Sequence, residues 1–271
     1  MSNLSFYTNT ILVDSIHKNN TFYFYDDREK SEFLSNKNKN KLDQRYLEKD
    51  IIYKFNSLGY RTDELTNAKD NDFILVFGCS HSEGIGLFEE DIWCSQLSSS
   101  LGIKKINLGK ASSGPDIQFI NTMQYIKNKY PKPKLVIYQW PQVHRRSFTY
   151  VPRAADPATD DETLIVKHQT VFTKTEKLDT GWYFRRFCVE SGEMLMGSYS
   201  HYTASNLLWN GLGVPVFNWT WGGDFTNTEL VEDLLVVDTI DTGRARDLMH
   251  DGPDIHSQVV DQILPKVDKL L

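Results

Sequence analysis

The 271-residue sequence is poor in cysteine and lacks both a long apolar stretch and an excess of basic residues. Its three cysteines, Cys79, Cys94 and Cys188, are odd in number and scattered. This pattern argues against a disulfide framework and favours a reducing compartment. No apolar run approaches the length of a membrane span, and residues 1–14 carry no basic cluster before an apolar stretch, so we recognise no signal peptide. We expect a cytoplasmic or otherwise soluble protein without a membrane partner.

Charge excludes a further class of partner. The formal charge is -6, and acidic and basic residues are mixed along the chain. There is no basic footprint of the kind that binds nucleic acid, and no strong field of either sign. The hydrophobic content of 40% is that of a soluble globular protein, and the length suffices for a full core.

Composition divides the chain into unequal parts. Residues 1–70 are polar and irregular, and we interpret them as an N-terminal extension packed on the main domain. The low-complexity tract 35–41 within them predicts an exposed loop. Residues 71–271 form the main domain. Residues 141–197 within it are rich in aromatic and charged side chains and lack its alternation of strands and helices, so we interpret them as an insertion. There is no internal repeat.

Strands and helices alternate in the main domain. Apolar runs, helical spacing and the positions of proline and glycine place these elements. We expect strands at 73–77, 104–108, 135–138, 214–219 and 234–238, and helices at 91–101, 115–127, 202–212, near 229 and at 253–270. Such alternation predicts an α/β fold with a parallel sheet covered by helices on both faces.

Two distant segments carry the residue types of a catalytic triad. The apolar run 73–77 leads straight into Gly78-Cys79-Ser80, and Asp247 stands three residues before His250. A serine hydroxyl becomes a good nucleophile when an imidazole takes its proton and a carboxylate fixes the tautomer of that imidazole. Ser80 follows the first strand and His250 lies beyond the last, so the sheet would bring both to one edge, the usual ligand crevice of an open parallel sheet.

Three short segments resemble sequence blocks I, II and V of the SGNH (GDSL-type) hydrolases. They are 77–84 (FGCSHSEG), 107–114 (NLGKASSG) and 246–250 (RDLMH), and the upstream string 55–61 is also similar to a lead-in seen in some members. The resemblance implies a flavodoxin-like three-layer α/β/α sandwich. It also implies Ser80 as nucleophile, His250 as base, Asp247 as its partner, and hydrolysis of esters or amides.

The sequence departs from the family pattern in two places. Cys79 stands where block I usually has aspartate, and residues 136–142 lack the Gly-x-Asn-Asp of block III, whose asparagine completes the oxyanion hole. A glutamine amide is the same kind of donor on a longer stem. We therefore expect the oxyanion hole to use the Ser80 and Gly109 N–H groups together with Gln139. Residues expected to contact substrate are His81, Trp140 and Arg145.

The sequence thus predicts a serine-dependent hydrolase without a cofactor or a metal. The reaction would be that of an esterase or deacylase, including removal of acetyl or other acyl groups from a carbohydrate, with a small-molecule or glycan ester as substrate. The alternative is a weak or inactive SGNH-like protein that binds glycan or serves a structural role. A third interpretation is a metal-dependent hydrolase built on His250 and His256. The oligomeric state stays open.

Every candidate residue also has a purely structural interpretation. Ser80 could simply cap a helix, and a carboxylate one helical turn before His250 could be an ordinary surface pair. Arg145 could be a solvated charge and Gly109 a loop glycine. What favours the catalytic interpretation is that these segments, chosen separately, converge on one edge of the predicted sheet.

Overall fold

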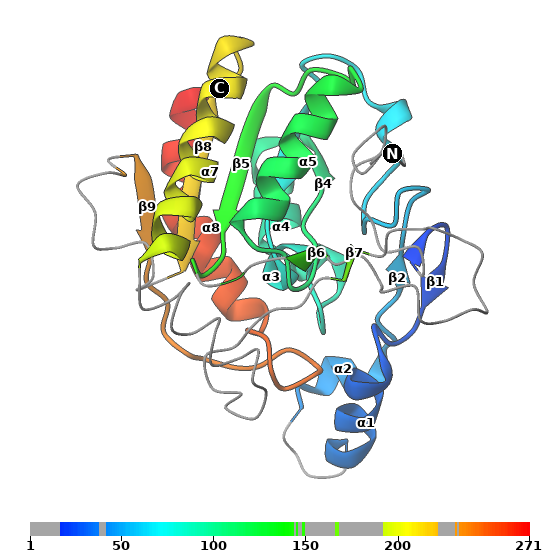
Figure 1. The fold of residues 1–271 in the computed structure, drawn as a ribbon. Helices are drawn as coiled ribbons and strands as arrows, with labels where there is room; N and C mark the ends of the chain where they lie inside the picture. Colours follow the sequence, from blue (N-terminus) through cyan, green and yellow to red (C-terminus); the bar gives the residue numbers. More distant parts are fainter. Residues whose placement is uncertain are drawn as a thin grey trace, which may run out of the picture.

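The computed structural model describes residues 17–37, 42–143, 145, 148–149, 166–167, 192–221, 231 and 233–271. Five parallel strands form its central sheet in the order β4-β3-β5-β8-β9 (Figure 1). They are β3 (Phe73–Phe77), β4 (Lys104–Asn107), β5 (Leu135–Trp140), β8 (Val216–Trp221) and β9 (Leu234–Val237). The five predicted strands and their parallel pairing are confirmed.

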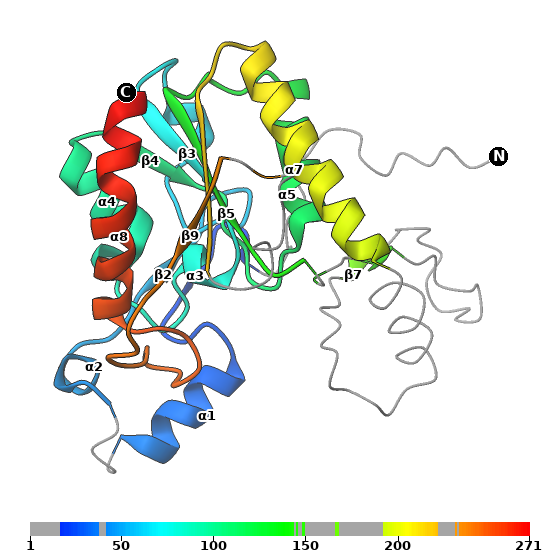
Figure 2. The ribbon, with the colours of Figure 1, turned by 90° about the vertical axis from the view of Figure 1, so that its left-hand side faces the viewer.

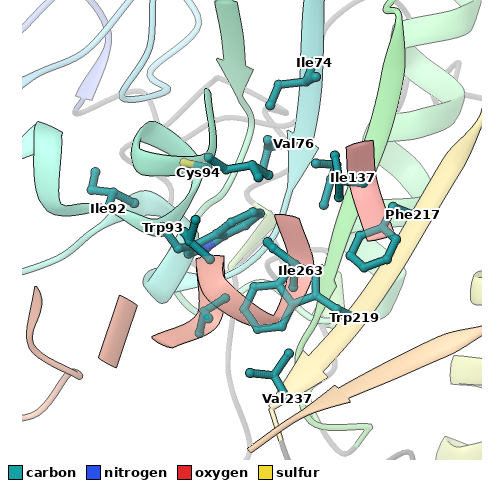
Figure 3. Close-up of a cluster of buried hydrophobic side chains, with 14 of the residues drawn as sticks. Ile74, Val76, Ile92, Trp93, Cys94, Ile137, Phe217, Trp219, Val237 and Ile263 are labelled. Carbon is teal, nitrogen blue, oxygen red and sulfur yellow. The ribbon is translucent and has the colours of Figure 1, made fainter. Parts of the chain in front are cut away.

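Helices cover both faces of this sheet (Figure 2). Leu75, Val136 and Tyr138 point to the face covered by α5 (Pro115–Lys127) and α7 (Glu193–Gly211). The alternate residues of the same strands, among them Val76 and Ile137, pack on α4 (Trp93–Leu101) and α8 (Pro253–Val267) (Figure 3). Because both faces are buried, β3 is apolar at every position. The three-layer α/β/α sandwich is as predicted, and its strand order is that of a flavodoxin-like sheet.

Two helices begin where the sequence predicts, each at a proline that follows a glycine. Pro115 opens α5 and Pro253 opens α8. Proline suits this first position because the fixed φ is helical and the first N–H groups of a helix need no internal partner. A glycine ends α4: Gly102 follows Leu101 with a φ of 63°, in the left-handed conformation that commonly terminates a helix.

Other boundaries differ from the prediction. Helix α7 begins at Glu193 and not near 202, so the predicted end of the insertion at 197 falls inside a helix. Its buried side chains include both Tyr199 and Ser198, and this mixture hides the apolar spacing that marks a helix. Gln139 and Trp140, expected just after the third strand, lie within β5.

The insertion is only partly described. Its described strands, β6 (Phe148–Thr149) and β7 (Val166–Lys167), pair antiparallel. The helix expected near 229 lies outside the described residues.

The N-terminal part is more regular than predicted. From residue 17 it contains β1 (Thr21–Phe22), paired antiparallel with β2 (Tyr53–Lys54), and the helices α1 (Asp27–Asn36) and α2 (Gln44–Glu48). The prediction of an exposed loop at 35–41 is wrong at Asn36, which is buried and ends α1. Short helical turns complete the described chain: η2 (Leu65–Asn67), α3 (Ser80–Glu83), η3 (Glu89–Asp91) and η5 (Asp268–Leu270).

Aromatic packing joins this N-terminal part to the main domain. Tyr46, Tyr53 and Phe55 form a buried cluster with Phe88, which follows the first βα turn. Within the described residues, no helix combines the length and the apolar content needed to cross a membrane.

We expect Ile137→Ala to destabilise the protein by about 2–5 kcal/mol, because Ile137 is fully buried in β5 and truncation leaves a cavity between the sheet and α8. Ile240→Ala serves as a matched control, since Ile240 is 77% exposed, and should change stability by less than about 0.5 kcal/mol. Urea unfolding followed by circular dichroism measures both. Equal losses for the two variants would contradict this account of the core.

Candidate active site

Ser80 lies at the carboxyl end of β3, at the start of the short helix α3. The preceding Gly78 must be a glycine, because a Cβ there would lie 2.0 Å from Ser82 Oγ and 2.9 Å from Gln139 Oε1. The Ser80 side chain is largely buried, with 7% exposed. Among the described residues, none makes a hydrogen bond with Ser80 Oγ or accepts one from the Ser80 N–H. Both groups are therefore free to meet a substrate.

The side-chain oxygen of Gln139 holds the turn that leads to Ser80. Gln139 Oε1 accepts from the Cys79 N–H at 3.0 Å, from Cys79 Sγ at 3.2 Å and from Ser82 Oγ at 3.1 Å. A backbone N–H can only donate, so the amide oxygen must face the turn and the NH₂ group must face away from it. This arrangement ties β5 to the nucleophile turn.

Asp247 and His250 form a compact hydrogen-bonded turn. Asp247 Oδ2 lies 2.5 Å from His250 Nδ1, and Oδ1 accepts from the backbone N–H groups of Met249 and His250, each at 3.1 Å. Leu248 between them has a φ of 58°, in the left-handed region that costs a non-glycine residue free energy. An ionised Asp247 keeps the proton of the imidazole on Nδ1, which leaves Nε2 free to act as a base.

Opposing effects act on the pKa of Asp247. Burial alone raises it, but the hydrogen bond and charge of His250, with the two backbone N–H groups, together lower the pKa below its ordinary value. The carboxylate is therefore ionised at neutral pH, as an orienting partner for His250 requires.

The loop after α3 brings the two segments together. Gly86 O accepts from the Arg246 N–H at 2.9 Å, and a Cβ at Gly86 would lie 2.7 Å from Ala245 Cβ and 3.1 Å from Asp247 Oδ1. Gly86 also has a φ of 77°, so it is required both for its conformation and for this close approach. The segment that follows Ser80 thus packs directly against the Asp-His turn.

The contacts of His81 show that the Ser80 turn and the Asp-His turn are close to each other. Its ring meets the His250 ring edge to face with centroids 5.3 Å apart, and it lies 4.3 Å from the ring of Trp221. Because His81 follows Ser80 in the chain, His250 stands beside the nucleophile turn. No hydrogen bond joins Ser80 Oγ to His250 Nε2 among the contacts of the described residues. The structure thus shows the Asp-His pair, but the Ser-His contact stays a prediction.

Two neighbouring histidines are neutral. Burial, followed by the charges of His250 and His256, lowers the pKa of His81 well below its ordinary value. Burial lowers the pKa of His256 to about 3, and its Nδ1 accepts the Trp93 N–H at 2.9 Å. The proton of His256 is therefore on Nε2, and Nδ1 is not available to a metal. In the described part of the chain, no group of three or more histidine, cysteine or acidic side chains is arranged to hold a metal ion.

Gly109 and Trp140, two further predicted site residues, already have other hydrogen-bond partners. The Gly109 N–H donates to Asn107 Oδ1 at 2.9 Å, so its predicted role in the oxyanion hole requires exchange of this bond. Trp140 is fully buried, stacked on Tyr138, and donates to Asn218 Oδ1 at 2.9 Å, so it faces the core and is not exposed to a substrate.

Arg145 lies at the same edge of the sheet. Its carbonyl carbon and oxygen pack against Gly114, and its charge contributes to the low pKa of His81 after burial and the two histidines. Its Nε is buried without a hydrogen-bond partner among the described residues.

Sequence reasoning missed a buried charge network behind the site. Lys110 Nζ lies 2.8 Å from Glu83 Oε1, and both side chains are almost fully buried. The second oxygen of Glu83 accepts from the Ala111 N–H at 2.6 Å and from Tyr25 Oη at 3.0 Å. Glu83 lies in segment 77–84 and Lys110 in segment 107–114. These opposite charges in two segments expected at one edge of the sheet were the signal that could have predicted the ion pair.

A cavity of about 500 Å³ lies elsewhere, between β1, β2 and residues 61–67. Asn19, Lys54, Asp63 and Glu89 are among the residues that line it, but none of the predicted site residues is. Size alone does not make it the reactive site, and no serine, histidine or cysteine is among the residues that line it.

Solved structures that resemble this chain include hydrolases of the GDSL and SGNH type. TesA is 12% identical with a TM-score of 0.44, covering 73% of this chain and 99% of TesA. A putative lipolytic protein of the G-D-S-L family from Desulfitobacterium hafniense is 10% identical, with a TM-score of 0.41 and coverage of 74% and 100%. AlinE4, an SGNH-hydrolase family esterase, is 15% identical, with a TM-score of 0.38 and coverage of 76% and 99%. No protein-family model and no curated protein sequence matches the chain.

His256 makes the stability of the protein depend on pH. Its folded pKa, about 3, lies below the unfolded value of about 6.5, so the unfolded state binds the extra proton between these values and stability falls as pH drops through this window. We expect His256→Gln, which keeps an acceptor for the Trp93 N–H, to flatten this fall. Urea unfolding at several pH values from about 7 to 4 measures it. An unchanged slope would contradict a buried neutral His256.

Proposed function

We propose that the protein is a serine-dependent hydrolase of the esterase or deacylase class, with Ser80, His250 and Asp247 as its triad. The observation that carries the proposal is the 2.5 Å contact between Asp247 Oδ2 and His250 Nδ1, at the edge of the sheet where Ser80 leaves β3. Acyl transfer requires a carboxylate that fixes the tautomer of an imidazole and a serine close enough for that imidazole to take its proton, and the Asp-His pair beside the Ser80 turn supports this arrangement.

The chemistry follows from these positions. His250 Nε2 takes the proton from Ser80 Oγ as the oxygen attacks the ester carbonyl carbon, and the carbonyl electrons move onto its oxygen. The oxyanion then re-forms the carbonyl and the bond to the alcohol oxygen breaks, while that oxygen takes the proton from the imidazolium held by Asp247, and an acyl-serine remains. Water, deprotonated by the same His250, attacks the acyl carbon; the bond to Ser80 Oγ breaks, Oγ takes the proton back, and the carboxylic acid is released. In this mechanism the Ser80 Oγ to His250 Nε2 contact tightens when substrate binds.

The oxyanion that develops needs donors already in place. The Ser80 N–H supports this role because no described residue accepts from it. Gln139 supports it through its NH₂ group, since its oxygen is committed to the nucleophile turn. Gly109 is the third proposed donor, and its N–H would exchange the hydrogen bond to Asn107 Oδ1 for one to the oxyanion. Loss of one such donor typically costs about 3–4 kcal/mol of transition-state stabilisation.

The substrate side of the site is more polar than the core behind it. His81, neutral and 21% exposed, and Arg145 are the side chains that we propose contact the substrate. A guanidinium at this place favours an ester that also carries a carboxylate or another anionic group. A glycan ester or a small-molecule ester of this kind is the substrate class proposed. Trp140 joins such a pocket only if its ring leaves the core.

A second candidate function has specific support. The Gly109 N–H already donates to Asn107, and Ser80 Oγ makes no hydrogen bond to His250 Nε2, which is what a catalytically weak SGNH-like protein that binds glycan at this edge would show. The two candidates differ in whether Ser80 reacts covalently.

Covalent labelling separates them. A fluorophosphonate probe should modify wild-type protein at Ser80 and leave Ser80→Ala unlabelled, because only a base-activated serine reacts. On an activated acyl ester, Ser80→Ala and His250→Ala should each remove most of the activity, and the double variant should be hardly worse, since both act in one step. Asp247→Asn should lose less than either. A folded wild type that neither labels nor turns over would favour the binding protein.

Gln139→Ala tests the least usual donor. If the Gln139 NH₂ meets the oxyanion, kcat should fall by about 10- to 1000-fold with little change in KM, because the contact strengthens in the transition state. Steady-state kinetics on the same ester give both constants. Since Gln139 also holds the nucleophile turn, circular dichroism and thermal melting should accompany the kinetics. A loss confined to KM would assign Gln139 to substrate binding.

A further inference from the structure

We propose that Glu29, in the N-terminal helix α1, is a positioning residue that holds the Asp-His turn in its productive geometry through Arg246. The inference rests on the proposed function of Asp247 and His250. It assigns the N-terminal segment 17–37, which contributes no triad residue, a part in the reaction. In Figures 1 and 2 this segment lies beside the loop that follows β9.

The contact between the two segments is a buried ion pair. Arg246 Nε lies 2.9 Å from Glu29 Oε1, and each side chain is only 1% exposed. Arg246 is the residue directly before Asp247, so its side chain fixes one end of the turn. Burying two opposite charges costs several kcal/mol in lost hydration unless further hydrogen bonds satisfy them. The Glu29–Arg246 pair has those hydrogen bonds.

Both carboxylate oxygens of Glu29 accept hydrogen bonds. Its Oε1 also accepts from Tyr53 Oη at 2.8 Å, and Oε2 accepts from the Tyr25 N–H at 2.6 Å. Burial and the Glu29 carboxylate raise the pKa of Tyr53 well above its ordinary value, so its hydroxyl stays a donor. Replacing one carboxylate oxygen by an NH₂ group would set a donor against a donor.

These bonds close into a ring next to the Asp-His turn. Tyr53 Oη accepts from the Gly86 N–H at 2.8 Å, and the Gly86 carbonyl accepts from the Arg246 N–H at 2.9 Å. Arg246 returns to Glu29 through its guanidinium. The ring thus joins α1, β2, the loop after the nucleophile helix and the Asp-His turn. A change at Glu29 reaches Asp247 through two routes, the side chain of Arg246 and the backbone of Gly86.

The rest of the Arg246 side chain is also enclosed. Its Nη2 donates to the Tyr23 carbonyl at 2.5 Å, and the guanidinium carbon lies 4.5 Å from the ring centroid of Phe24 and 5.5 Å from that of Phe33. All these groups belong to the N-terminal segment. The segment thus surrounds this guanidinium with an acceptor carbonyl, a carboxylate and aromatic rings, a more specific set of partners than packing alone requires.

The test measures the Asp247–His250 contact directly. In wild type, the proton on His250 Nδ1 should give a far-downfield ¹H NMR resonance, absent in Asp247→Asn. Glu29→Gln should weaken or remove this resonance and lower kcat by on the order of 100-fold with little change in KM, because the base is displaced while the substrate pocket remains. The matched control is Glu48→Gln, which removes the same charge from exposed Glu48 in α2 and should leave both readouts unchanged.

Arg246→Lys keeps a charge that can pair with Glu29 but loses the planar contacts with Tyr23 and Phe24. It should shift the downfield resonance without removing it and lower kcat, though by less than Glu29→Gln does. It also guards against a Glu29→Gln variant that fails to fold, which circular dichroism would reveal. In that event, Arg246→Lys with full kcat and an unshifted resonance overturns the proposal.

The outcomes separate this proposal from the proposed function. A folded Glu29→Gln with the resonance and the kcat of Glu48→Gln overturns the positioning role. If wild type shows no turnover and no Ser80 labelling, the hydrolase assignment fails, yet loss of the resonance in Glu29→Gln would still support the positioning of the turn by Glu29.

Discussion

The side-chain oxygen of Gln139 accepts three hydrogen bonds from the turn that carries Ser80, and the position of that turn depends on this attachment. A parallel sheet ends in carbonyl and N–H groups that no further strand satisfies, so the turn after β3 needs a partner of its own. An internal residue of β5 supplies it. The turn that carries Ser80 is thereby held by the neighbouring strand, and the position of Ser80 does not depend on loops alone.

Buried charge extends this attachment outward. Glu83 pairs with Lys110 behind the nucleophile turn, and Glu29 pairs with Arg246 behind the Asp-His turn. A buried ion pair is weak evidence for stability, because hydrophobic residues of similar volume often do as well. The Arg246 guanidinium does supply direction, since a planar group with fixed N–H positions satisfies its partners in few orientations, whereas the Lys110 ammonium is a compact charge. The Glu29–Arg246 pair therefore accounts for the orientation of the Asp-His turn more than for the stability of the fold.

The sequence was sufficient for the sheet and for the Asp-His pair, since both depend on local signals. The apolar run 73–77 before Gly78 marks a strand, and Pro115 marks the start of α5. Each boundary can be predicted from a few neighbouring residues. Glu29 and Arg246, by contrast, are 217 residues apart, and nothing in the sequence around either one indicates the other. The start of α7 was missed for a different reason, because serines and tyrosines share its buried face.

The conformation of the Asp-His turn costs free energy, and this cost favours the proposed catalytic role over glycan binding alone. Leu248 sits in a left-handed conformation, which costs about 1–2 kcal/mol, and a nearly buried carboxylate is kept ionised beside it. A glycan-binding edge needs neither, because hydrogen bonds to sugar hydroxyls can be made by a histidine in either tautomer. A carboxylate on Nδ1 is what the proposed base needs, since it fixes which nitrogen of His250 accepts the proton. The conformation of Leu248 and the ring of bonds through Arg246 both support this proposed role of His250.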